Sequence, residues 1–279
     1  MRIKSDMELL GAYAETGNPE AFAEIVSRYG AVVYQVCFRK LFNRQDAEDA
    51  SQAVFMTLVK KAGKMKKEGS LAGWLHKVAR ETAQYAARTR INRIRKESAA
   101  AEAMDAESHP LVTASDREMA LKVLDEELDS LSAVQREAVI LRYLKGLCEK
   151  DAAAFAGCAP NTLTCRGNDG LSHLRQRMLR RGCALSVPAL IGILDAEANA
   201  AIPETLIPSL MAVPKMAAAG AVAGTASASI INIMKGALTT MASTNIKTVG
   251  VGILIALLTG TAGVMAVREI QKGQAPVAS

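Results

Sequence analysis

Positively charged side chains gather in one stretch of the sequence and give the first indication of its chemistry. Between Lys60 and Lys96 there are twelve lysines and arginines against two acids, Glu68 and Glu81, which is a local net charge of +10. The whole chain of 279 residues carries only +6, so the remainder is net acidic. A basic cluster this dense favours a polyanion partner such as nucleic acid, the alternative being an ordinary solvated surface.

The nucleophilic and metal-ligating residue types form no comparable pattern. Five cysteines stand at positions 37, 148, 158, 165 and 183 without CxxC spacing, which suggests neither a disulfide framework nor a zinc ribbon and favours a reducing compartment. The three histidines, His76, His109 and His173, share no motif, and the sequence lacks GxxxxGK, GxSxG and HExxH. We therefore expect a binding protein rather than an enzyme, with no cofactor and no metal.

Almost every periodic stretch has helical rather than alternating spacing, so the elements that carry the basic cluster are predicted to be helices. Asn18 is a good N-cap and Pro19 suits the first helical position. Residues 1–96 are predicted to form a compact helical domain with helices at Asp6–Glu15, Asn18–Phe42, Asp46–Met65, and from a Ser70 cap into the basic Arg88–Lys96 stretch.

A second helical domain is predicted at residues 116–182, after a small, polar linker at 97–115 that is interrupted by Pro110. Its helices are expected at Asp116–Leu128, from the Ser132 capping box through Leu144 to Gly146, at Cys148–Ala156, and from Thr162 to about Met178 with Asn161 as N-cap. The last two, joined by a short glycine-containing turn, have the proportions of a helix-turn-helix. Two short packed helices without DNA binding are the alternative.

In order and spacing, these motifs resemble the extracytoplasmic-function sigma factors of the sigma-70 family. The matching segments are DxELLxxYxxTGNPEAFAEIVxRYG, QDAEDASQAVFMTL, SLAGWLHKVARETAQ and, after the linker, LSAVQREAVILRYLKG with the helix-turn-helix, together covering roughly residues 6 to 181. The resemblance implies that the first domain is sigma region 2, which binds the beta-prime clamp helices of core RNA polymerase and the minus-ten promoter element. It implies that the second domain is sigma region 4, which binds the minus-thirty-five element and the beta flap.

The resemblance assigns polymerase docking to the start of the helix at Asp46–Met65. The docking side chains would be Asp46, Glu48, Asp49 and Gln52. Without the resemblance, these residues are ordinary acids at a helix N-terminus, each worth tenths of a kcal/mol to about one.

The minus-ten contacts are assigned by the same resemblance to a basic loop and the helix that follows it. The residues concerned are Lys66, Lys67, Trp74, Lys77, Arg80 and Arg88. Opening a duplex requires cations to hold the displaced backbone and a pocket for an extruded base. Trp74 has apolar spacing with Leu71, Leu75 and Val78, so core packing is its alternative role. The family commonly has asparagine where Arg80-Glu81 stands, so its minus-ten preference does not carry over.

The minus-thirty-five contacts are assigned to the exposed side of the second helix of the helix-turn-helix. They are Asn161, Thr162, Thr164, Arg166, Asn168 and Arg175, opposite a buried stripe of Leu163, Leu171, Leu174 and Met178. Arg166 is the candidate for a bidentate guanine contact, whereas Arg175 is expected to meet phosphate. Gly167 and Asp169 depart from the apolar and basic residues expected there and predict weak or altered minus-thirty-five binding.

The carboxy-terminal part has a different composition. All eleven aromatic residues lie before position 156, and residues 183–247 are expected to be a low-complexity, small-residue tail. Residues 248–267 are twenty uncharged residues, long enough at 1.5 Å per residue to span about 30 Å as a transmembrane helix. Gly252, Ala256 and Gly260 leave homodimerisation open.

The predicted molecule is therefore all-α, with two small helical domains, a transmembrane helix, and a short extracytoplasmic end at residues 268–279. It would be held at the inner membrane with its DNA-binding part in the cytoplasm, and an anti-sigma factor or a protease would be a candidate regulator. One alternative is a membrane-anchored helix-turn-helix regulator that does not dock on polymerase. Another is a membrane scaffold whose basic helix binds acidic lipid.

Overall fold

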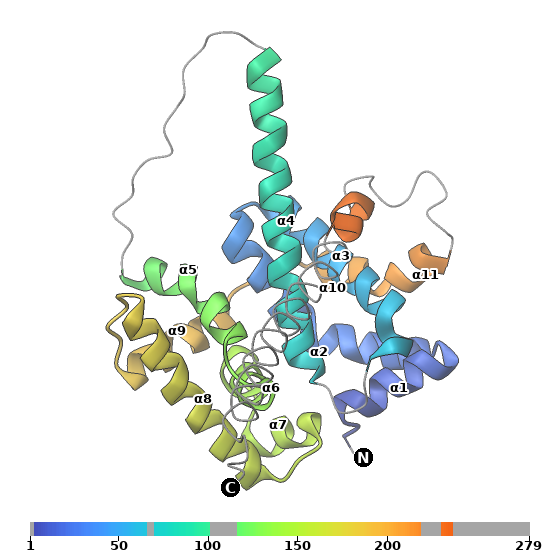
Figure 1. Ribbon diagram of the computed structural model, residues 1–279. Helices are drawn as coiled ribbons and strands as arrows, with labels where there is room; N and C mark the ends of the chain where they lie inside the picture. The colour runs from blue at the N-terminus through green and yellow to red at the C-terminus, as the bar shows by residue number, and fades with distance from the viewer. Residues whose placement is uncertain (1–2, 66–69, 101–115, 219–229, 237–279) are drawn as a thin grey trace, which may run out of the picture. The chain divides into compact units, whose positions relative to one another are not determined.

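The computed structural model describes residues 3–65, 70–100, 116–218 and 230–236, and these residues are helical with connecting turns and no strand (Figure 1). All of them fall in one compact unit that spans Met1–Ala237. The expected all-α class is thus confirmed for the part of the chain that the structure describes.

The amino-terminal bundle consists of four α-helices and one short 3₁₀ turn. They are α1 (Asp6–Thr16), α2 (Pro19–Leu41), α3 (Arg44–Lys61), η1 (Ala62–Lys64) and α4 (Leu71–Ala100). The side chain of Asn18 accepts hydrogen bonds from the first turn of α2, with Pro19 at the first helical position, as predicted. Apolar residues of α2, α3 and α4 fill the core, Phe22, Phe55 and Leu75 among them, each stabilising the fold by about 1.5–3 kcal/mol.

The second bundle consists of α5 (Asp116–Asp129), α6 (Ala133–Val139), a π-helical turn η2 (Ile140–Leu144), α7 (Glu149–Ala156) and α8 (Pro160–Arg180). Ser132 caps α6, and Gly146 and Gly157 turn the chain with φ of 65° and 66°. The predicted cap at Asn161 was wrong. The helix begins at Pro160 and its N-cap is Ala159, because proline with its fixed φ suits the first helical position.

A glycine of α8 allows this helix to approach α6 closely. A Cβ on Gly170 would lie 2.8 Å from Val139 Cγ2 and 3.1 Å from the Gln135 carbonyl oxygen. Gly167 is also buried, but a Cβ there would lie 3.9 Å from Ala138 and Tyr143, an ordinary contact distance, so the close approach does not explain why glycine stands at this position. The expected apolar stripe of α8, Leu163, Leu171, Leu174 and Met178, is buried.

Beyond the second bundle, where the sequence predicted a low-complexity, small-residue tail at residues 183–247, the chain forms further helices. They are α9 (Val187–Ala198), α10 (Leu206–Met211) and α11 (Val213–Ala218), and residues 230–236 are also helical. We call residues 187–218 the carboxy-terminal strap. Its α9 packs on η2 and α8, whereas α10 packs on α2 and α3, and α11 packs on α3 (Figure 1). The strap buries two pairs of leucines that are four residues apart: Leu190 with Leu194, and Leu206 with Leu210.

The expected membrane location is corrected by the structure. Among residues 3–65, 70–100, 116–218 and 230–236, no helix is both long and apolar enough to cross a bilayer. The long helices α2 and α4 carry many charges, and the apolar α9 has only 12 residues, whereas a span needs about 20. Residues 248–267, on which the expectation of a tether rested, lie outside the described residues, as do Gly252, Ala256 and Gly260. No membrane tether enters the function proposed below.

Candidate nucleic-acid interface

The acids at the start of α3 lie at the surface of the amino-terminal bundle. Asn43 caps the helix by accepting a hydrogen bond from the Asp46 backbone N–H at 3.0 Å. The side chains expected to dock keep local partners: Asp46 pairs with Arg90 of α4 (3.2 Å), Glu48 with Arg44 (3.0 Å), and Asp49 accepts from Gln45 (3.3 Å). Gln52 is half-buried. Surface pairs contribute about 0–1 kcal/mol each, so a protein partner can displace them at little cost.

Two exposed aromatic residues lie just before these acids and were missed by sequence reasoning. Phe42 follows the end of α2 in the left-handed conformation, with φ 50° and 72% of its surface exposed. Phe38 is also exposed and stacks on Tyr34. A left-handed residue after a helix is usually glycine, because a Cβ is strained there. The sequence signal that could have identified Phe42 is a phenylalanine at such a junction, directly before a helix cap. An exposed ring on a strained backbone favours a binding role.

The basic side chains of α4 differ in how they are presented. Lys77 and Arg88 are exposed and Trp74 is half-buried, whereas Lys66 and Lys67 lie outside the described residues. Arg80 points to the second bundle, with its Nε 2.5 Å from Asp129 Oδ2 of α5. Its neighbour Glu81 is buried, and this burial raises the pKa of the carboxyl group. Arg80 is therefore occupied by an acid of the same chain.

His76 lies between the same two elements and forms the centre of a buried charge cluster. Its Nε2 is 3.1 Å from Asp125 and its Nδ1 is 3.2 Å from Asp129, and its side chain is fully buried. Burial opposes the imidazolium, but the hydrogen bonds and charges of the two carboxylates outweigh burial and raise the pKa of His76. Sequence reasoning found no partner for this histidine. The sequence signal that could have revealed the partners is a shared spacing. His76 and Arg80 are four residues apart on one helix, and Asp125 and Asp129 are four residues apart on another.

Arg39 of α2 extends the cluster to the strap. Its guanidinium binds Asp125 at 2.6 and 3.1 Å and Glu197 of α9 at 3.0 Å. Burial raises the pKa of Asp125, but the charges and hydrogen bonds of Arg39 and His76 dominate and hold it well below its usual range. A buried pair that loses one partner is strongly destabilising, so these bonds define how α2, α5 and α9 meet.

The helix-turn-helix presents only part of its predicted reading surface. Asn161, Thr162 and Asn168 are exposed, and Arg166 is half-buried. The hydroxyl of Thr164 donates to Glu149 of α7. The Nε of Arg175 donates to the Leu185 carbonyl at 2.8 Å, two residues before the strap begins. The first three residues are thus available to a ligand, whereas Thr164 and Arg175 already have protein partners.

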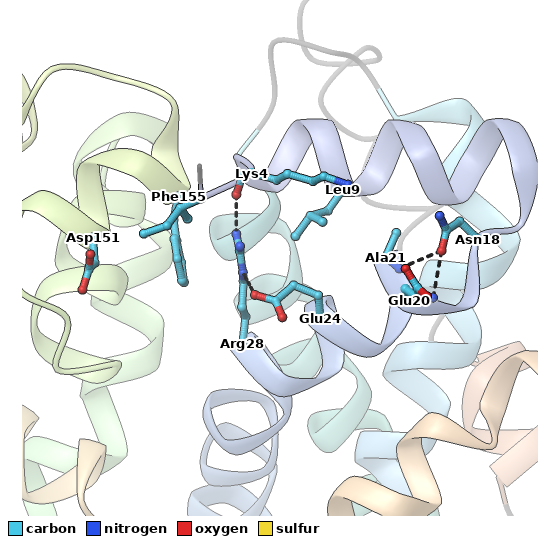
Figure 2. A pocket seen from close by; sticks show the side chains of 10 residues that line it. Lys4, Leu9, Asn18, Glu20, Ala21, Glu24, Arg28, Asp151 and Phe155 are labelled. Atoms are coloured by element: carbon cyan, nitrogen blue, oxygen red, sulfur yellow. Dashed lines mark hydrogen bonds and ion pairs between the residues drawn. The ribbon is translucent and has the colours of Figure 1, made fainter. Parts of the chain in front are cut away.

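A cavity of about 520 Å³ lies where α1 and α2 meet α7. Figure 2 shows Arg28 in its wall beside Lys4 and Glu24, with Phe155 across from them. Arg28 donates to the Lys4 carbonyl (2.9 Å) and to Glu24 (2.8 Å), and its guanidinium lies 3.7 Å from the centre of the Phe155 ring. Because Nε and Nη1 of Arg28 are engaged and its charge is paired with Asp6 and Glu24, this seam joins the two bundles rather than offering a cation to a ligand.

A family match covers the helices that carry the acidic and basic surfaces. Residues 25–98 match Sigma-70 region 2, a stretch that runs from within α2, through α3, to near the end of α4. It therefore includes the exposed aromatic residues, the acids of α3 and the basic residues of α4.

Several similar proteins are named as sigma factors. RNA polymerase sigma factor CarQ of Myxococcus xanthus is 26% identical over 161 residues, covering 57% of this chain and 90% of that protein. ECF RNA polymerase sigma factor SigM of Mycobacterium tuberculosis is 23% identical over 163 residues, covering 58% and 79%. ECF RNA polymerase sigma factor SigK of a Mycobacterium species is 26% identical over 182 residues, covering 62% and 91%. Together with the region 2 match, these similarities support an extracytoplasmic-function sigma factor that acts in transcription initiation.

Proposed function

We propose that this chain binds core RNA polymerase, directs it to a set of promoters and helps to open the DNA there, without catalysing a reaction itself. The observation that carries the proposal is the content of residues 25–98. The region 2 match includes an acidic helix start beside exposed aromatic side chains, and a helix with exposed cations. A DNA-binding protein that does not dock on polymerase has no need of the first of these surfaces.

Docking on polymerase is proposed for the start of α3. Asp46, Glu48, Asp49 and Gln52 would meet basic and polar groups of the beta-prime clamp helices, and Phe42 would bury its ring among them. Such an arrangement of one desolvated aromatic anchor with a polar rim is common in protein interfaces. A contact of the second bundle with the beta flap is also proposed.

Contact with the minus-ten element is proposed for the loop before α4 and for α4 itself. Lys66, Lys67, Lys77 and Arg88 would hold the DNA backbone, and Arg80 would join them once it leaves Asp129. Trp74 would form a wall of the pocket for an extruded base. Unstacking a base costs a few kcal/mol, which these contacts must offset.

Contact with the minus-thirty-five element is proposed for α8. Arg166 would bind guanine, a contact worth about 1–3 kcal/mol of discrimination. Asn161, Thr162, Thr164 and Asn168 would line the same groove, and Arg175 would meet a phosphate. The buried Gly170 allows α8 to pack closely on α6, which affects the direction in which this surface faces.

The test is run-off transcription reconstituted from core polymerase, the full-length chain and a promoter library. Asp49→Arg should abolish promoter-dependent product, because it reverses a charge on the docking surface. Glu20→Arg is the matched control, since Glu20 is an exposed acid near the start of another helix, α2, and it should transcribe like wild type. Equal loss in both variants would contradict docking at α3, and no product with the wild type would overturn the sigma function.

Base reading is tested in the same assay. Arg166→Ala should change which minus-thirty-five sequences are used. Arg180→Ala, an exposed arginine further along α8, should instead reduce output from all promoters alike, because a phosphate contact carries no sequence information. An unchanged promoter preference with Arg166→Ala would show that this arginine does not read bases.

A further inference from the structure

The carboxy-terminal strap connects the two bundles by packing on both of them. Its first helix, α9, lies on η2 and α8 of the second bundle, and α10 lies on α2 and α3 of the first. Figure 1 shows α9 next to α8, and α10 beside α3. The chain therefore crosses from one bundle to the other between Asn199 and Thr205.

The surface of α2 on which α10 packs, which we call the seat, has a glycine, Gly30, where α10 lies closest. A Cβ on Gly30 would lie 2.8 Å from Ile207 Cδ1 and 3.2 Å from Leu210 Cδ1, so its two nearest contacts would both be side chains of α10. Gln35 donates its side-chain amide to the carbonyls of Ala200 and Ala201 at 3.2 and 3.5 Å. Residues 32–37 of α2 are all buried, although a helix covered on one side only would expose some of them. The strap supplies part of that second cover.

The strap also closes the charge cluster at the seam between the bundles. Glu197 of α9 holds Arg39 from one side while Asp125 of α5 holds it from the other. On the same seam, Asp129 holds Arg80. Within the second bundle, the carbonyl of Leu185 just before the strap holds Arg175. Two arginines proposed to contact promoter DNA are thus bound by protein groups in this arrangement.

This arrangement cannot contact both promoter elements at once. α4 packs on α6 and α6 packs on α8, so the two proposed DNA-binding helices are about two helix packings, or about 20 Å, apart. Elements centred at minus ten and minus thirty-five are about 25 base pairs apart, which is about 85 Å of B-form DNA at 3.4 Å per base pair. The bundles must separate before the chain engages a promoter.

We infer that the strap is an internal ligand of α2 that holds the two bundles closed, and that its release is the step that makes the chain competent for promoters. The inference rests on the proposed sigma function. A six-residue α10 is too short to be a stable helix by itself in water, so release of the strap is coupled to its unfolding. The linker at residues 97–115 then connects two bundles that the strap no longer holds.

The experiment compares adjacent substitutions in α10 of the full-length chain. Leu210 is fully buried and Met211 is 42% exposed, so Leu210→Asp should release the strap while Met211→Asp, with the same added charge, should not. Hydrogen exchange of the α10 amides monitors release without polymerase. The functional readout is the concentration of chain that gives half-maximal run-off transcription, and Leu210→Asp should lower it about tenfold, as for a two-state equilibrium that loses its inhibited form.

A second experiment tests the same contact by enlarging a residue of α2 and then shrinking the residue of α10 that faces it. Gly30→Leu should displace α10 and reproduce the lower half-maximal concentration. Adding Ile207→Ala should restore the wild-type value, because it makes room for the new side chain. A misfolded α2 would not be rescued in this way, so failure of the rescue counts against the inference.

The outcomes separate the inference from the proposed function. If Leu210→Asp exposes the α10 amides to exchange but the half-maximal concentration stays at the wild-type value, the strap does not inhibit and only the inference fails. If the wild type and every variant give no run-off product, the sigma function fails and the inference fails with it.

Discussion

Glu137 is a buried acid whose ionisation opposes folding at neutral pH. Burial raises its pKa to about 7, although Ser70 hydrogen-bonds to it. A carboxyl group with a raised pKa binds more protons in the folded state than in the unfolded state. Stability therefore falls as pH rises from about 4.5, where the unfolded group ionises, to about 7, where the folded group does.

Glu137→Gln is expected to remove that penalty. The variant should exceed wild type in free energy of unfolding by up to about 3 kcal/mol at about pH 8 and by little near pH 4.5. Urea unfolding at the two pH values measures the difference. A gain of the same size at both values would mean that the improvement comes from packing rather than from ionisation.

Phe42→Gly should raise stability and weaken docking at the same time. Glycine adopts φ 50° without the Cβ strain, a gain of about 1 kcal/mol in free energy of unfolding. Under the proposed function the same change removes the aromatic anchor, so affinity for core polymerase should fall. Thermal unfolding and a polymerase-binding titration report the two effects separately. Loss of stability together with affinity would indicate that the ring is structural.

At the scale of residues, the sequence predicted which side chains are polar and exposed better than it predicted their partners. Asn161 and Thr162 are exposed and the acids of α3 partly exposed, because local periodicity determines which face of a helix a residue occupies. Arg80 was expected at DNA but is held by Asp129. That pairing depends on which two helix surfaces meet, and no local pattern encodes this.

At the scale of elements, the packing of α6 on α8 predicts opposite changes in stability when two glycines of α8 are replaced by alanine. Gly170→Ala should lower stability by about 1–3 kcal/mol, because its Cβ would overlap Val139 and the rigid backbone of Gln135. Gly167→Ala, three residues earlier, meets only ordinary contacts at 3.9 Å and should gain up to about 1 kcal/mol in helix propensity. Thermal unfolding of both variants is the measurement. Equal effects would contradict the close approach.

Most helices of the two bundles could be predicted because amphipathic periodicity and caps such as Asn18 and Ser132 are visible in the sequence. The strap could not. Its helices α10 and α11 have six residues each, which is under two turns, and they are apolar without a charged face that would reveal a period. Their structure depends on the surface of α2 and α3 beneath them, which lies more than a hundred residues away in sequence.

For the whole molecule, the cluster around His76 predicts a pH dependence of the closed state. The groups that face this imidazole are Asp125 and Asp129 of α5, and beyond them Arg39 of α2, Arg80 of α4, Arg136 of α6 and Glu197 of α9. Since the pKa of His76 is raised from 6.5, its contribution is complete below about pH 6.5 and is lost as pH rises through the folded pKa. The two aspartates, with lowered pKa values, weaken the seam only in acid, below about pH 4.

The closed state should therefore loosen as pH rises through the raised folded pKa of His76. Hydrogen exchange of α5, corrected for the intrinsic pH dependence of exchange, should increase in the wild type as pH rises above about 6.5, the ordinary value for histidine. His76→Gln should abolish this dependence, since a neutral amide does not titrate. If exchange of α5 increases with pH in the variant as it does in the wild type, a group other than His76 causes the pH dependence.

The glycine seat on α2 also orders events in time. Gly30 leaves the ribosome long before Ile207, the residue that fills its place, since 177 positions separate them. At about 5–20 residues per second of synthesis, that interval is roughly 10–35 seconds. Throughout it, a newly made amino-terminal bundle has α3 but not its strap. Under the inhibitory role inferred for the strap, a polymerase that meets the nascent chain in this interval meets a bundle that the strap does not yet cover.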